Sequence, residues 1–404
     1  MTDADPSRPR PGAQHRRAPA LRRPGGTAPS AAAAAGHERD AGVASPPATG
    51  REDLPPTPPA KTVRDPFLDN ARGILITLVV VGHTLECFDG KSGFLGGAIH
   101  TWIYSFHMAA FVAISGFLSR SYRNEPRQVR RLLTAMLAPF LIFQMLHEVG
   151  KMLLLGQEFH LQFVSTAWTL WFLLALLMWR LITPVLRVLR YPLVFAVAVA
   201  VIAPLDPDLD STFTLGRFFE MLPFFVLGLV TTPAMLQKLK TLPHRVWIGG
   251  GVLLAALVFS FATHEMYSVA RFFLRGSYAD GPYENWLAII MQILVLAAGM
   301  VGTVALLLAT PLGQTIWTAL GARSLTIYLL HPLVLLPIRY MDEPFAWVEA
   351  WWAPLPLIVI GLAITAVLSR GIIATATRWV TDPPIGNLLV KDEVAPQGGR
   401  RTAA

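Results

Sequence analysis

Long apolar runs constrain the fold of this chain more than any other feature. From residue 67 to residue 373, the sequence alternates apolar stretches with short polar segments. Most of these stretches have the roughly 17 to 25 residues that an α-helix needs to cross a bilayer. Only 15% of the residues are charged, against about 25% in a typical soluble chain. The sequence therefore predicts an all-α, polytopic membrane protein in contact with a lipid bilayer.

We expect ten membrane-spanning helices. Their approximate ranges are 67–87, 98–118, 130–154, 168–188, 192–205, 215–232, 245–263, 285–309, 322–341 and 353–373. The fifth is short and is included because Pro192 and Pro204 bracket a continuous apolar run rich in Val and Ala. Arg and Lys gather in the N-terminal arm and in alternate loops, which predicts that both termini are cytoplasmic. The mixed loop 264–284 gives this orientation its weakest support.

The chain divides into three segments by composition. Residues 1–64 are rich in Pro, Ala, Gly and Arg and are expected to form a disordered basic arm. No apolar stretch follows the paired arginines of this arm, so we expect no cleaved signal there. Residues 65–381 form the expected transmembrane domain. Residues 382–404 form a second disordered tail.

The net charge of +8 does not indicate a nucleic-acid partner, because the basic residues lie in the short segments between apolar runs. A single cysteine, Cys87, excludes an internal disulfide and a cysteine-based metal site. We expect no bound metal. Whether the chain forms a homo-oligomer stays open.

The first apolar run begins with an arginine and ends with a histidine. Arg72 and His83 are eleven positions apart, almost three helical turns, so both lie on one helix face. They are separated by about 16 Å along the axis. This places Arg72 near the cytoplasmic surface and His83 deeper in the bilayer. An ionisable group at that depth is a candidate functional residue.

Other polar residues interrupt the later runs. His107 and His331 lie at depths related to that of His83, which predicts a shared polar cavity. We assign His83, Arg72 and His107 to catalysis. The candidate substrate-binding residues are His331, Ser115, Glu148 and Glu220. Hydrogen bonds between helices, close packing or buried ion pairs are the alternative roles for these side chains.

These residues suit acyl transfer from a phosphate-bearing donor. A neutral imidazole shielded from water can accept a proton from a hydroxyl group near neutral pH. An arginine cluster at the cytoplasmic mouth can bind phosphate groups. Arg127, Arg130 and Arg131 are the candidate ligands for these phosphates; their alternative role is only to set topology.

Six sequence segments, in the order in which a known family has them, carry a resemblance to that family. They are RDPFLDNARGILITLVVVGH with Arg72 and His83, FHMAAFVAISGFL from Phe106, Arg130-Arg131 leading to Pro139, LWFLLALLMWRL from Leu170, GRFFEMLPFFVLGL from Gly216, and SLTIYLLHPLV from Ser324. Over residues 65 to 390 the chain resembles integral-membrane acyltransferase family three, and within it the fucose 4-O-acetylase-like branch.

The resemblance implies an O-acetyltransferase of the bacterial plasma membrane. The donor would be cytoplasmic acetyl-CoA or a similar acyl-CoA, with no permanently bound cofactor. The acceptor would be a hydroxyl of a cell-envelope glycan or a lipid-linked sugar. His83 would act as general base or, alternatively, as a transient acyl carrier.

Two other functions stay open at this point. Buried His and Arg residues also suit a transporter or flippase for a lipid-linked saccharide, although we find no internal repeat of the kind that transporters often have. A partner subunit of a polysaccharide export complex would show no dependence on CoA. Thiol release from acetyl-CoA separates these alternatives from the enzyme.

Overall fold

The computed structural model describes residues 65–88, 93–160, 164–210, 212–264, 266, 272–280, 284–340, 348 and 350–384. The arm expected at 1–64 and most of the tail expected at 382–404 lie outside these residues. Within them the fold is helical, and the extended pairing is limited to an isolated bridge between Ser165 and Thr212. The all-α prediction is confirmed for this part of the chain.

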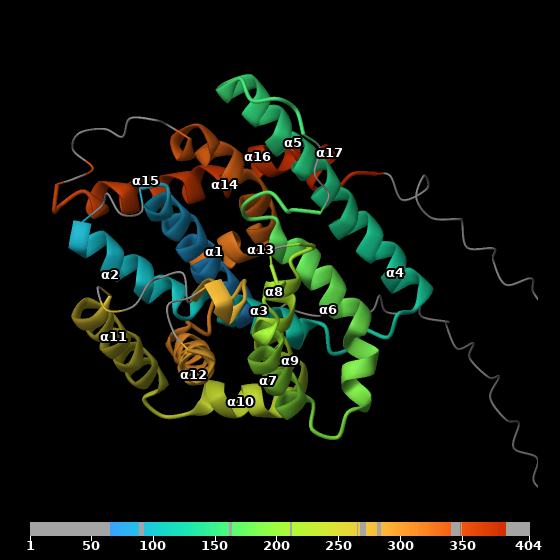
Figure 1. The fold of residues 1–404 in the computed structure, drawn as a ribbon, viewed down its shortest axis with the longest axis vertical. Coiled ribbons are helices and arrows are strands. Elements are labelled where there is room, and N and C mark those ends of the chain that lie inside the picture. Colours follow the sequence, from blue (N-terminus) through green and yellow to red (C-terminus); the bar gives the residue numbers. More distant parts are fainter. Residues whose placement is uncertain are drawn as a thin grey trace, which may run out of the picture. The chain divides into compact units, whose positions relative to one another are not determined.

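Seventeen α-helices are present in the described ranges (Figure 1). They are α1 (Pro66–Glu86), α2 (Gly93–Tyr104), α3 (His107–Leu118), α4 (Pro126–Leu132), α5 (Ala138–Leu155), α6 (Trp171–Val188), α7 (Pro192–Ile202), α8 (Leu215–Glu220), α9 (Leu222–Val230), α10 (Pro233–Thr241), α11 (Arg245–Thr263), α12 (Asn285–Ala309), α13 (Ile316–Ala322), α14 (Ser324–Arg339), α15 (Pro354–Leu368), α16 (Gly371–Ala376) and α17 (Arg378–Thr381). A π-helical turn at Leu133–Leu137 joins α4 to α5, and a 3-10 turn at Ala203–Leu205 extends α7.

Six helical segments of the described chain are long and apolar enough to cross a membrane. They are Pro66–Glu86, Gly93–Leu118, Pro126–Leu155, Trp171–Val188, Arg245–Thr263 and Asn285–Ala309. Two bent pairs, Leu215–Val230 with Pro233–Thr241 and Ile316–Ala322 with Ser324–Arg339, raise the number to eight if each is one span. The shorter apolar helices Pro192–Leu205 and Pro354–Leu368 lie where the remaining expected spans were placed. The count of ten and the cytoplasmic termini stay predictions.

The bend between α9 and α10 has a local cause in the sequence. The chain turns by 85° between α9 and α10. Pro233 disfavours helical geometry in the residue before it, and Thr232 is accordingly extended. Its hydroxyl oxygen then accepts a hydrogen bond from the backbone N–H of Met235 and caps α10. The helix expected at 215–232 therefore ends at Val230, and a second helix runs away from it.

Helix α1 lies among the other helices, in contact with α13, α15, α3 and α14 (Figure 1). Asp65 caps it by accepting from the N–H of Phe67 at 3.0 Å, and Pro66 occupies the first turn. The approach to α13 is close: a Cβ built on Gly321 would lie 1.8 Å from the carbonyl oxygen of Asp69. The backbones of α1 and α13 therefore touch directly, which requires glycine at this position.

A buried asparagine fixes the same end of α1. The side-chain amide of Asn70 donates to the carbonyl oxygens of Pro311 and Gly313 at 2.9 and 2.6 Å. Its oxygen accepts from the hydroxyl groups of Thr315 and Thr318 at 2.9 and 2.6 Å. Asn70 thus binds the connection between α12 and α13 to the first half of α1.

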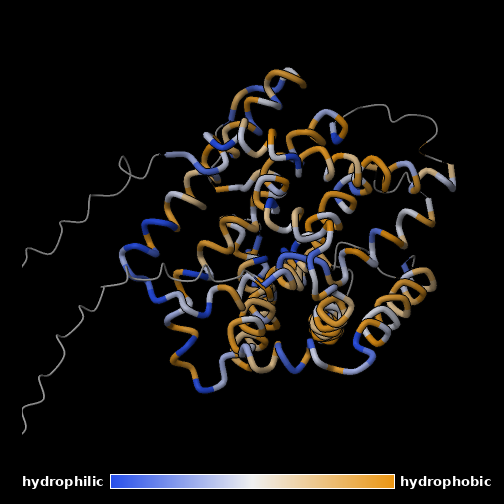
Figure 2. Tube along the Cα trace, turned by 180° about the vertical axis from the view of Figure 1, so that it is seen from behind, coloured by the Kyte–Doolittle hydropathy of each residue, from blue (hydrophilic) through white to orange (hydrophobic). Residues whose placement is uncertain are grey.

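The surface of the helices is apolar over large areas. Trp247 on α11 is 81% exposed, and Val258 on the same helix is 62% exposed. Figure 2 shows hydrophobic helical segments whose connections are more hydrophilic. Exposed apolar surface on this scale fits contact with lipid rather than with water.

Candidate active site

A cavity of about 220 Å³ lies at the C-terminal end of α1. Helices α1, α3, α8 and α14 contribute to its wall, together with the segments around 165–169 and 272–275. The titratable side chains in its lining are His83, Glu86, Tyr104, His107, Arg217, Arg275, Tyr328 and Arg339. Polar groups at this density in a membrane protein mark a functional site.

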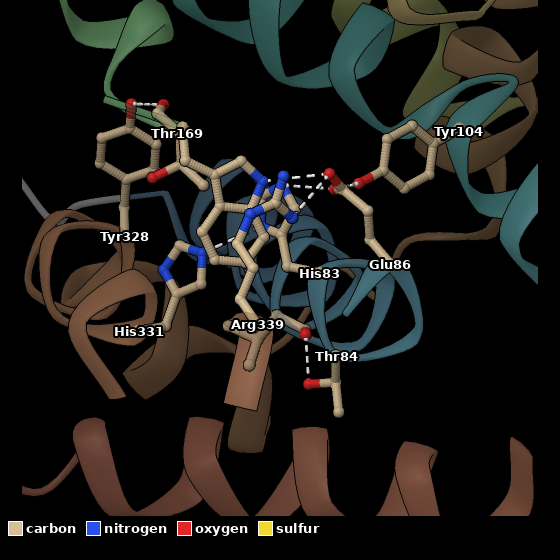
Figure 3. Close-up of polar contacts among 10 residues, drawn as sticks. His83, Thr84, Glu86, Tyr104, Thr169, Tyr328, His331 and Arg339 are labelled. Carbon is tan, nitrogen blue, oxygen red and sulfur yellow. Dashed lines mark hydrogen bonds and ion pairs between the residues drawn. The ribbon is translucent and has the colours of Figure 1, made fainter. Parts of the chain in front are cut away.

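His83 and His331 form a pair at the edge of this cavity. The Nδ1 atom of His83 lies 3.0 Å from Nε2 of His331 (Figure 3). His331 is fully buried behind His83, and its own Nδ1 lies 2.9 Å from the carbonyl oxygen of Ile327. The structure therefore brings together two of the three histidines that the sequence predicts to share a cavity, in direct contact.

The hydrogen bonds assign the tautomer of each ring. A carbonyl oxygen only accepts, so Nδ1 of His331 carries a proton, and in the neutral ring its Nε2 is an acceptor. Nδ1 of His83 must then donate to that nitrogen. The lone pair of His83 is consequently on Nε2, the atom on the side of the ring that faces Glu86 in the cavity lining, 3.9 Å from its Oε2. An unprotonated imidazole nitrogen in a cavity is the group required of a general base.

Glu86 is the centre of a second set of contacts. Its Oε2 accepts a hydrogen bond from the hydroxyl of Tyr104 at 2.7 Å, and its Oε1 accepts from Nε1 of Trp168 at 3.1 Å (Figure 3). Nη1 of Arg339 lies 3.2 Å from Oε1. The carboxylate is thus fixed beside His83, where its negative charge would stabilise a protonated imidazole.

His107 lines the same cavity from the start of α3. Its Nδ1 lies 2.8 Å from the carbonyl oxygen of Ile103, so this nitrogen donates and Nε2 carries the lone pair. The ring packs edge-on against Tyr104, with centroids 4.7 Å apart. His107 therefore lines the same cavity as His83, whereas His331 lies behind His83 and is not part of the lining.

Arg72 lies elsewhere. It forms an ion pair with Asp69 within the first turns of α1 and does not line the cavity. Its separation from His83 stays at about 16 Å along the helix. The two residues belong to one helix, but the structure does not bring them into one cavity.

The other predicted residues are also outside the cavity lining. Arg127, Arg130 and Arg131 belong to the short helix α4. The hydroxyl of Ser115 donates to the carbonyl oxygen of Phe111 in its own helix at 2.9 Å. Glu148 pairs with Lys151 at 2.8 Å, and Glu220 accepts from Nε2 of Gln292 at 3.0 Å. These contacts match the alternative, structural roles, while the functional roles stay predictions.

Several cavity residues were not singled out from the sequence. Glu86 follows His83 by three positions and so shares its helix face, a signal that helical spacing gives. Arg339 lies in the last turn of α14, where an arginine normally marks only the end of a span. Trp168 and Tyr104 have ordinary interface positions in the sequence. Only the fold shows that these three side chains converge on one carboxylate.

Comparisons with known proteins cover most of the chain. A family model described as "Acyltransferase domain" matches residues 65–370. Nodulation protein NolL of Sinorhizobium fredii is 25% identical over 354 residues, which cover 79% of this chain and 89% of the relative. Nodulation protein NolL of Mesorhizobium japonicum is 48% identical over 58 residues, 14% of this chain and 16% of the relative. No solved structure matches.

Proposed function

Because the chain belongs to the acyltransferase family whose model matches residues 65–370, we propose that it is an integral-membrane O-acetyltransferase. The donor is cytoplasmic acetyl-CoA or a similar acyl-CoA, and the acceptor is a hydroxyl of a cell-envelope glycan or a lipid-linked sugar. The protein would act in the bacterial plasma membrane. The observation that carries the proposal is the lone pair on Nε2 of His83, fixed by His331 beside a polar cavity.

The geometry supports a general-base mechanism. Nε2 of His83 takes the proton of the acceptor hydroxyl while its oxygen attacks the thioester carbonyl carbon. The tetrahedral intermediate then expels the CoA thiolate, which takes the proton back from the imidazolium. Glu86, 3.9 Å from Nε2, stabilises the imidazolium between these two steps. Transient acylation of Nε2 is the alternative, and it uses the same atom.

The donor must reach His83 from the other end of α1. In the predicted orientation Arg72 and the arginines of α4 lie toward the cytoplasm, whereas Glu86 and the cavity lie toward the outer face. The phosphates of CoA would bind near Arg72, Arg127, Arg130 and Arg131. The thioester would then extend about 16 Å along α1 to the level of His83.

The test uses the purified chain in lipid nanodiscs with acetyl-CoA and extracted envelope glycans. We expect release of CoA thiol that depends on the acceptor, together with acetylated glycan detected by mass spectrometry. His83→Ala should lower the rate by at least about 100-fold, the usual contribution of a general base. His160→Ala is the matched control, because His160 is largely exposed and pairs only with Glu158.

Three outcomes distinguish the functions. Thiol release that survives His83→Ala would remove His83 from the mechanism. Absence of thiol release with every acceptor tried, together with uptake of a lipid-linked saccharide into vesicles, would support the transporter instead. If the chain shows neither thiol release nor uptake, the result would support the export-complex subunit.

A further inference from the structure

Arg217 and Arg275 are two cations in the cavity lining with no acidic partner among the described residues. Neither forms an ion pair or a hydrogen bond to a carboxylate there. Instead, each guanidinium lies over an aromatic ring. The Cζ atom of Arg217 is 4.6 Å from the ring centroid of Trp171, and that of Arg275 is 4.9 Å from the centroid of Phe273. Ring contacts hold the planar faces of the two guanidinium groups and leave their N–H edges available.

The backbone brings these two arginines together from distant parts of the sequence. Gly216, the neighbour of Arg217, packs against the segment that carries Arg275. A Cβ built on Gly216 would lie 2.5 Å from the carbonyl oxygen of Arg275. The two side chains therefore leave adjacent backbones and line one cavity. The backbone contact is built by the fold, with Arg217 partly buried and Arg275 exposed at the cavity.

Among the described residues that line the cavity, the one carboxylate is already engaged. Glu86 pairs with Arg339 and accepts hydrogen bonds from Tyr104 and Trp168. With neutral histidines, the described lining therefore carries three guanidinium groups and one carboxylate, a surplus of two positive charges. Arg217 is partly buried, and a partly desolvated charge is costly unless an opposite charge meets it. A bound anion would supply that charge.

The position of the arginines indicates which substrate brings the anion. They lie at the Glu86 end of α1, beside the segments 165–169 and 272–275 that bound the cavity. The opposite end of α1 begins at Asp65, which pairs with Lys240 near the predicted cytoplasmic face. The phosphates of a cytoplasmic donor would meet that opposite end first. An anion at Arg217 and Arg275 therefore belongs to the acceptor.

We propose that Arg217 and Arg275 bind an oxyanion group of the acceptor, a carboxylate or a phosphate, so that the enzyme prefers acidic sugars to neutral ones. Two guanidinium forks match the planar oxygens of a carboxylate and the oxygens of a phosphate. The ring of the sugar would then place a hydroxyl group toward Nε2 of His83. This inference rests on the proposed function for its catalytic part, but the binding site can be tested without turnover.

The binding experiment uses the full chain in nanodiscs and isothermal titration with glucuronate, glucose 6-phosphate and glucose. We expect at least one anionic sugar to bind about tenfold or more tightly than glucose, as charge-assisted hydrogen bonds provide. Arg217→Gln and Arg275→Gln should each remove most of this preference, whereas Arg275→Lys should keep part of it. Arg190→Gln is the matched control, because Arg190 is exposed and lies over its neighbour Tyr191.

A second measurement separates the acceptor from the donor. Acetyl-CoA is titrated into the same variants, and acetyl transfer is compared between p-nitrophenyl glucuronide and p-nitrophenyl glucoside. The expected result is unchanged acetyl-CoA affinity and a loss of glucuronide preference in Arg217→Gln and Arg275→Gln. Weaker binding of acetyl-CoA in those variants would overturn the proposal in favour of a donor-phosphate site.

Other outcomes also decide the question. Equal binding of glucose and both anionic sugars by the unaltered chain would overturn the anion site while leaving acetyl transfer intact. Anion binding that is lost in Arg275→Gln, with no thiol release from acetyl-CoA under any condition, would support the site and refute the proposed enzyme. Sedimentation of each variant as a single species checks that the fold is kept.

Discussion

Replacing His331 with alanine removes the group that accepts the Nδ1 proton of His83. The contact is 3.0 Å long and joins the fully buried His331 to the partly buried His83. Without it, His83 must either leave a buried N–H unsatisfied or shift its proton to Nε2. The first state costs about 1–3 kcal/mol, and the second lacks the lone pair that accepts the proton of the acceptor.

The expected rate follows from that cost. If the reactive tautomer of His83 lies about 1–3 kcal/mol higher in His331→Ala, the rate of acetyl transfer falls about 5- to 150-fold. The loss should appear in kcat, because His331 lies behind His83 and does not line the cavity. His331→Gln should lose less, since its side-chain oxygen can still accept from His83.

The assay is acetyl transfer at varied acetyl-CoA and saturating acceptor, with protein in nanodiscs. His147→Ala is the matched control. His147 is also buried and also has Nδ1 2.8 Å from the carbonyl oxygen four residues earlier, but it does not contact His83. A kcat of His331→Ala equal to that of the unaltered chain would refute the tautomer argument, as would an equal loss in His147→Ala.

Three further substitutions test the cavity and the helix contacts. Glu86→Gln removes the charge that faces Arg339 at 3.2 Å and should lower both kcat and the thermal unfolding temperature, measured by differential scanning fluorimetry; an unchanged kcat would exclude a role beside His83. Asn70→Ala removes the two bonds donated to carbonyl oxygens and the two accepted from hydroxyl groups and should reduce the free energy of unfolding in detergent by about 1–3 kcal/mol; an unchanged value would contradict this role. Gly228→Val places a Cβ 1.8 Å from the carbonyl oxygen of Ala113, so folded protein on size-exclusion chromatography should be largely lost; a normal yield would contradict the close contact of α3 and α9.

The sequence was sufficient for the helical class of the fold and for finding three histidines that lie near one another. Apolar length locates the spanning segments because a bilayer imposes that length on any helix that crosses it. The histidines could be found because an ionisable residue within an apolar run is recognisable from the sequence alone. His83, His107 and His331 lie within one polar region of the structure.

The parts of the site and the fold that the sequence does not predict depend on contacts between segments far apart in the chain. Arg217 and Arg275 are 58 positions apart in the sequence, and nothing in their local surroundings indicates that they line one cavity. Arg339 reaches Glu86 from the end of α14, and Trp168 reaches it from the turn before α6. Helical spacing places residues on a face but does not say which faces meet. The bend of 78° between α13 and α14 likewise follows from packing against α1, which apolar length does not encode.

The two attachments of α1 restrict how this protein can work. Asn70 ties the first half of α1 to the segment before α13, and His83, about 20 Å further along, ties the second half to α14. A carrier that exposes its cargo to each side in turn has to rock one group of helices against another. Rocking α1 against α13 and α14 would break hydrogen bonds at both ends simultaneously. These attachments favour a reaction centre whose helices keep their places, as the proposed acyl transfer requires.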